Sequence, residues 1–133
     1  MTILGFRTEL DPDFQRKCLD NWLELGSAQK AASKLGVSMY LVRRHSWIYI
    51  CEHPLECRNY LDRVSENDML GRTLTDEEYY HLVSIRASNY LVSEKKIREF
   101  IEKTELWRYP KALEVFKVKY PRVYNSYISK VQK

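Results

Sequence analysis

Apolar residues recur at three- and four-residue intervals along most of this chain, a pattern typical of amphipathic helices. The first such stripe follows Asp11 and Pro12, an order of cap and proline that favours a helix start. It comprises Phe14, Cys18, Leu19, Trp22, Leu23 and Leu25. Only four glycines and four prolines occur in 133 residues, and they fall between the stripes. The pattern therefore predicts an all-α fold.

The clearest helix start in the second half is a capping box. Thr75 is placed to cap the next helix, and Glu78, three residues later, can return a hydrogen bond. Leu74 and Tyr79 have the spacing of a hydrophobic staple around it. The stripe that follows consists of Tyr79, Leu82, Val83, Arg86, Ala87 and Tyr90.

Further boundaries divide the chain into two predicted domains. Three more helix starts are expected at Ser93, Pro110 and Pro121. A short helix is expected at 56–64, and the polar stretch 65–71 is a candidate hinge. We therefore predict a domain over residues 1–64 and a helical domain over 65–133 that serves oligomerisation or partner binding and ends in a basic tail.

The segment 26–49 has the order of a helix-turn-helix. Gly26 suits the left-handed exit from one helix, and Ser27 can cap the next. Gly36 allows the tight turn, and Ser38 can cap the helix after it. With the helix from Pro12, this order predicts a three-helix unit that resembles the homeodomain arrangement.

The second helix of this motif has two faces. One is expected to face the domain core, with Leu41, Val42, His45, Ser46 and Tyr49. The other can enter a DNA major groove, because arginine donates paired hydrogen bonds to guanine or contacts phosphate. The candidate DNA-binding residues are Ser38, Met39, Tyr40, Arg43, Arg44, Trp47, Lys30 and Lys34. The alternative is an ordinary solvated face on a helical domain that never meets nucleic acid.

Charge is concentrated at the end of the chain. The formal net charge is +4, and residues 1–55 are nearly neutral, with seven basic and six acidic side chains. Residues 107–133 hold seven basic side chains and one acidic one. A basic tail can add salt-dependent affinity for nucleic-acid phosphates, and the alternative is a lysine-rich helical face that favours solubility.

Signals for catalysis are weak. Glu78 and His81 have the spacing found in di-iron bundles, but no second copy occurs. Cys51, His53 and Cys57 lie close together without a strong zinc pattern, so free thiols are expected and a zinc-dependent domain is the third alternative. No phosphate loop or nucleophile elbow is present. We therefore expect no enzyme activity and no cofactor.

Composition favours a soluble protein of a reducing compartment. The odd number of cysteines, three, suggests no disulfide framework. No apolar run approaches the roughly 18 residues that span a bilayer, and the first residues do not have the form of a secretion signal. We expect a cytoplasmic protein without a membrane partner, in the host cytoplasm if it is viral.

One stretch resembles a known family. Phe14 to Leu25, Gly26, Ala31-Ala32, Gly36-Val37-Ser38, Val42 and Arg44 look like the N-terminal motif of bacteriophage terminase small subunits. Related motifs occur in transposase-associated and phage regulatory proteins, which often have an aromatic residue where His45 stands. The resemblance covers about the first 60 residues. It implies recognition of viral DNA during packaging, a ring of subunits, and a large-subunit partner.

The sequence thus predicts a non-enzymatic protein that binds double-stranded DNA, of viral or mobile-element type, and forms a homo-oligomer. Packaging and transcriptional regulation are both open within that class. The alternative from another class is a helical interaction subunit of a polymerase or virion assembly.

Overall fold

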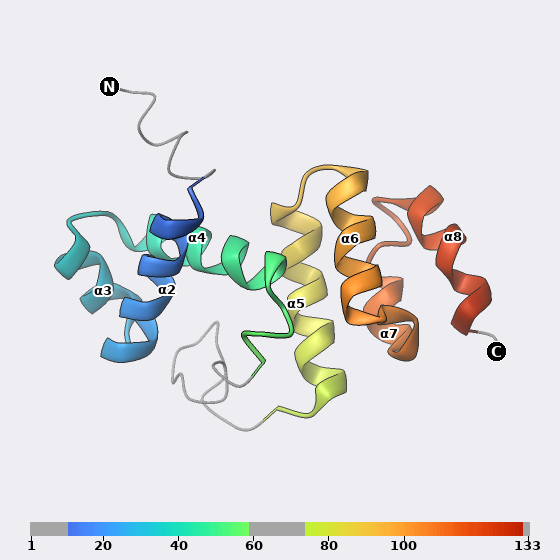
Figure 1. Cartoon of the computed structure of the whole chain (residues 1–133), viewed down its shortest axis with the longest axis horizontal. Coiled ribbons are helices and arrows are strands. Elements are labelled where there is room, and N and C mark those ends of the chain that lie inside the picture. The colour runs from blue at the N-terminus through green and yellow to red at the C-terminus, as the bar shows by residue number, and fades with distance from the viewer. Residues whose placement is uncertain (1–10, 59–73, 132–133) are drawn as a thin grey trace. The chain divides into compact units, whose positions relative to one another are not determined.

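The computed structural model describes residues 11–58 and 74–131, and its regular elements there are all helical (Figure 1). This confirms the predicted all-α class. The elements are α2 (Pro12–Leu25), α3 (Ala28–Leu35), α4 (Met39–Glu52), α5 (Asp76–Tyr90), α6 (Glu94–Thr104), the 3-10 turn η2 (Leu106–Arg108), α7 (Pro110–Glu114) and α8 (Pro121–Val131).

Internal contacts divide the chain into two units. The first consists of residues 1–50 and 57–73, and the second of residues 51–56 and 74–133. The second unit therefore includes the end of α4 and the turn that follows it. The short helix expected at 56–64 begins as a turn at 56–58, and the rest of it lies, with the hinge expected at 65–71, outside the described residues.

Polar side chains begin each helix of the first unit. The side chains of Asp11, Ser27 and Ser38 accept hydrogen bonds from backbone N–H groups two or three residues later, at 3.0, 3.3 and 3.1 Å. Each bond satisfies a donor that the first turn of a helix leaves without an intrahelical partner. The three predicted caps are therefore confirmed.

Two glycines end α2 and α3. Gly26 and Gly36 have φ values of 73° and 72°, in the left-handed region. Their N–H groups donate to the carbonyls of Trp22 and Ala32 at 2.8 Å each. A Cβ built on either glycine would meet no atom within 4 Å. The backbone conformation, and not a lack of space, is therefore what favours glycine here.

We predict that Gly36→Ala lowers the free energy of unfolding by about 1 kcal/mol, because an alanine at positive φ is strained. Gly36→Asn should cost less, since asparagine tolerates this conformation better than alanine. Chemical denaturation of both variants measures the difference. Equal losses for alanine and asparagine would argue against backbone strain as the cause.

The first unit is held together by contacts between α2 and the other two helices. Phe14 meets the ring of His45 edge-on, with 5.0 Å between centroids. Arg16 donates to the hydroxyl of Tyr49 at 3.0 Å and to Asp20 at 2.8 Å, which raises the pKa of its guanidinium. The buried apolar side chains of these helices include Cys18, Leu19, Trp22, Ala28, Ala31, Ala32 and Val42.

Burial of Cys18 links the stability of this unit to pH. Removal from water raises the pKa of the thiol from 9.0 to about 11, because the thiolate loses its hydration. Between these values the unfolded chain has released the proton and the folded chain still holds it. Stability from this group is therefore present below pH 9 and is lost as the pH rises toward 11.

We predict that the free energy of unfolding of the wild type falls more steeply than that of Cys18→Ala between pH 9 and 11. The extra loss should be about 2 kcal/mol, the greater part of the free energy that the pKa shift represents. Urea denaturation of both proteins across this range measures it. If the free energies of unfolding of the two proteins fall in parallel with pH, Cys18 does not contribute to the pH dependence of stability.

Predicted caps also begin the helices of the second unit. The N–H of Glu78 donates to the Thr75 hydroxyl at 3.1 Å, and the Thr75 N–H donates to the Glu78 carboxylate at 3.0 Å. The capping box is therefore confirmed. Ser93 caps α6, and α7 and α8 begin at Pro110 and Pro121, as expected.

The helices of the second unit pack around a shared core. α5 contacts α6 and α7, α8 contacts the same two helices, and η2 lies against α6, α7 and α8. The largest fully buried side chains among them are Tyr79, Phe100, Phe116, Ile97, Ile101 and Leu106. No helix in the described part of the chain combines the length and apolar composition of a membrane span.

The end of α4 is fastened to this core by polar contacts. Lys96 of α6 donates to the Glu52 carboxylate at 2.7 Å, which raises the pKa of the lysine. Lys103, two turns later on α6, donates to the Glu52 carbonyl at 2.9 Å. The Tyr79 hydroxyl donates to the carbonyl of Pro54. α6 thus neutralises the carboxylate and satisfies one of the carbonyls at the end of α4.

Candidate nucleic-acid interface

The exposed part of α4 is its first half. Tyr40 is 64% exposed, and Arg44 donates to its hydroxyl at 3.4 Å. Met39, Arg43 and Arg44 are partly exposed. Ser38 is exposed, and its hydroxyl caps the helix. These residues form the surface that α4 can offer to a ligand.

The second half of α4 is buried up to Cys51. All residues from 45 to 51 are buried, including Trp47, whose exposed fraction is 1%. His45 and Ser46 are polar, but residues 47–51 are apolar in successive positions, and a helix that is apolar all round is buried. The side chain of Trp47, a predicted DNA contact, is therefore inaccessible in this structure. The exposed face of α4 ends at Arg44.

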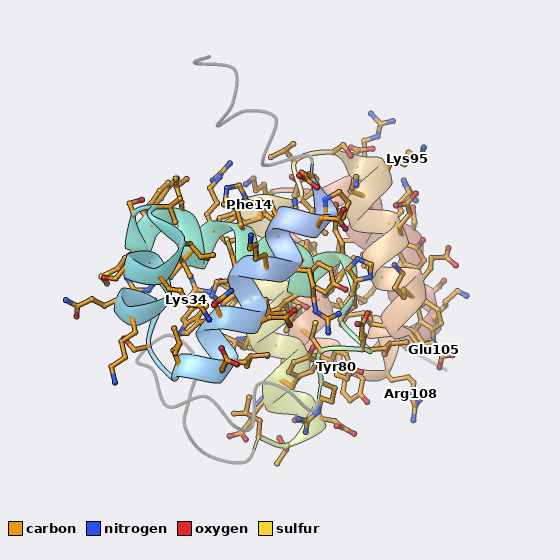
Figure 2. The ribbon with its side chains drawn as sticks, turned by 60° about the vertical axis from the view of Figure 1, so that its left-hand side comes forward. Phe14, Lys34, Tyr80, Lys95, Glu105 and Arg108 are labelled. Atoms are coloured by element: carbon orange, nitrogen blue, oxygen red, sulfur yellow. The ribbon has the colours of Figure 1, made fainter. Side chains whose placement is uncertain are left out.

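The two lysines predicted to contact phosphate lie on α3. Lys30 and Lys34 are both exposed. Lys34, labelled in Figure 2, forms an ion pair with Glu24 of α2, with 3.4 Å between the Lys34 Nζ and Glu24 Oε1 atoms. An exposed pair of this kind contributes little free energy, so Lys34 can exchange its partner for a phosphate at small cost.

Acidic side chains are unevenly distributed over the first three described helices. Residues 26–51, which include α3 and nearly all of α4, carry Lys30, Lys34, Arg43 and Arg44 and no acidic side chain. The acids at positions 11, 13, 20 and 24 precede this stretch. The near-neutral total over residues 1–55 therefore conceals a purely basic stretch, residues 26–51, which ends one residue before Glu52. Counting charge by helix would have revealed this in the sequence.

The cysteines that suggested a metal site are buried. Cys51 and Cys57 are free thiols with exposed fractions of 1% and 0%, and the Cys51 thiol donates to the Val83 carbonyl. His53 lies 3.8 Å from Glu56. Within residues 11–58 and 74–131, no three His, Cys, Asp or Glu side chains are grouped as a metal site.

Comparison with protein-family models, with curated proteins and with solved structures gave no match to this chain. The resemblance of the first 60 residues to terminase small subunits thus stays a prediction from their motif. Function has to be inferred from the side chains that the two units present.

Tyr40 and Trp47 should respond differently to truncation. We predict that Trp47→Ala lowers the free energy of unfolding by about 3–5 kcal/mol, because it removes a large buried side chain. Tyr40→Ala should change it by less than about 0.5 kcal/mol, because most of this side chain is in water. Thermal and chemical denaturation test both. A small effect at Trp47 would mean that its side chain is free to reach a ligand.

Proposed function

We propose that the chain is a non-enzymatic protein that binds double-stranded DNA through a helix-turn-helix formed by α3 and α4, with the exposed first half of α4 in the major groove. In such motifs the N-terminal residues of the second helix contact base edges. The exposed residues at the start of α4 have the chemistry for this, since arginine hydrogen-bonds guanine and tyrosine can contact phosphate.

The observation that carries the proposal is the charge of residues 26–51. This stretch holds four basic side chains and no acid, and the one acid of the two helices, Glu52, is the last residue of α4 and is paired with Lys96. A phosphate backbone repels carboxylates and attracts lysine and arginine, so α3 together with the acid-free first half of α4 suits this ligand. The caps at Ser27 and Ser38 and the turn at Gly36 support the helix-turn-helix order.

Individual roles follow from position. Arg43 and Arg44 would contact guanine or phosphate, and Tyr40, hydrogen-bonded to Arg44, would hold that guanidinium near the helix start. Lys30 and Lys34 of α3 would contact phosphates beside the groove. Ser38 and Met39 lie at the N-terminus of α4, where backbone N–H groups favour a phosphate oxygen.

We predict that Arg43→Ala with Arg44→Ala weakens binding to duplex DNA and makes its salt dependence shallower. Loss of two phosphate contacts should reduce the slope of log K against log salt by about 1.8. Fluorescence anisotropy with a duplex of roughly 30 base pairs, about three helical turns, measures this. A loss of base contacts would lower affinity without the change in slope.

The matched control is Lys17→Ala with Lys95→Ala, which removes two exposed cations outside α3 and α4. It should leave the slope within error of the wild type, and thermal unfolding should confirm that both variants fold. Equal effects of the two double variants would argue against a role for α4. No DNA binding by the intact protein at low salt would favour the helical interaction subunit.

Two biological uses fit this binding activity. The resemblance to terminase small subunits favours DNA packaging together with a large-subunit partner, and the motif also fits a transcriptional regulator. Packaging requires a ring of many subunits, whereas a regulator is typically a dimer on a two-fold site. The mass of the protein in solution, with and without DNA, separates them, and a stable monomer would weigh against packaging.

A further inference from the structure

A second concentration of positive charge lies in the last helices. Within the described residues 107–131 the one acidic side chain is Glu114. The basic side chains there are Arg108, Lys111, Lys117, Lys119, Arg122 and Lys130. This charge belongs to the second unit, whereas α3 and the exposed half of α4 belong to the first.

Most of these cations lack a carboxylate partner. Some cations elsewhere in the described chain pair with acids, as in Lys96 with Glu52 at 2.7 Å and Arg16 with Asp20 at 2.8 Å. Within residues 107–131, Arg108 has such a partner, Glu105, at 3.5 Å. No ion pair with a described carboxylate is found for Lys111, Lys117, Lys119, Arg122 and Lys130. Their charge is therefore available to an anion.

An aromatic ring supports Lys130. Its ammonium lies 4.3 Å from the centroid of the Trp107 ring, and Trp107 in turn stacks on Tyr127 with 5.9 Å between centroids. A ring face attracts a cation without neutralising it. The contact restricts the lysine side chain, so less conformational entropy is lost when the ammonium meets a phosphate.

Two lysines of the turn before α8 also have their ammonium groups near aromatic rings. The ammonium of Lys117 lies 5.9 Å from the Tyr124 ring, and that of Lys119 lies 5.8 Å from the Tyr120 ring. Lys119 also donates to the carbonyl of Ser88 at 2.7 Å, which holds it in place and leaves its charge uncompensated. Three of the five unpaired cations are thus positioned by rings.

The arrangement favours phosphates over bases. Tyr120, Tyr124 and Tyr127 have exposed fractions of 9%, 8% and 5%, so they offer no surface on which unpaired bases could stack. Arg122 and Lys130 are eight residues apart on α8, a rise of about 12 Å. This distance spans three to four phosphates of one strand, at about 3.4 Å of axial rise each.

We propose that Lys111, Lys117, Lys119, Arg122 and Lys130, here named the α8 basic surface, form a second contact with the phosphate backbone of double-stranded DNA. This inference rests on the proposed function for its ligand, but it uses different residues. The surface has four lysines and one arginine. The rings that contact it are buried tyrosines and the partly exposed Trp107, whose ring already contacts Lys130 and Tyr127. The surface therefore adds affinity that is independent of DNA sequence.

The test compares Lys117→Gln plus Arg122→Gln with a matched control, Lys17→Gln plus Lys95→Gln. Each pair removes two exposed charges, and Lys95 lies at the start of α6 (Figure 2). We expect the first pair to reduce the slope of log K against log salt by about 1.8, and equally for duplexes of different sequence. The control pair should leave the slope unchanged, and thermal unfolding midpoints should match.

The outcomes separate this inference from the proposed function. An unchanged slope for Lys117→Gln plus Arg122→Gln, with weaker binding by Arg43→Ala plus Arg44→Ala, overturns the α8 basic surface and leaves α4 in its role. If Lys117→Gln plus Arg122→Gln reduces the slope while Arg43→Ala plus Arg44→Ala leaves DNA binding unchanged, the α8 basic surface is supported and recognition by α4 is overturned. No binding of duplex DNA by the intact protein overturns both.

Discussion

The first unit depends on a backbone constraint, the left-handed conformation at Gly26 and Gly36. These two residues end α2 and α3 ten positions apart, so they limit α3 to the eight residues from Ala28 to Leu35. Each glycine is followed, within two residues, by a serine that caps the next helix. The start of α4, and with it Tyr40 and Arg44, therefore takes its position from two φ angles.

Helix boundaries could be predicted from the sequence because their causes are local. Ser93 bonds an N–H three residues away, and Pro121 needs only its own ring to favour the first turn of α8. The all-α class follows from the spacing of apolar residues, which is also local. The same reasoning succeeded at Thr75, whose partner Glu78 lies within one helical turn.

Features that depend on distant residues could not be predicted this way. Trp47 was predicted to lie on the exposed face of α4, but helix spacing alone does not reveal that all residues from 45 to 51 are buried. The contact of Glu52 with Lys96 joins residues 44 positions apart. The basic character of residues 26–51, by contrast, does not depend on distant residues. It could be read from the sequence, but summing the charge over 55 residues concealed it.

The two cationic surfaces differ in the chemistry that they offer. α4 presents arginine beside an exposed tyrosine, and a guanidinium can distinguish guanine from other bases through paired hydrogen bonds. The α8 basic surface is mostly lysine, whose ammonium is a point charge that suits any phosphate. Under the proposed function, α4 would therefore supply discrimination between sequences. The α8 basic surface would supply affinity. The four cations of residues 26–51 would provide only part of that affinity, because each phosphate contact loses strength as the salt concentration increases.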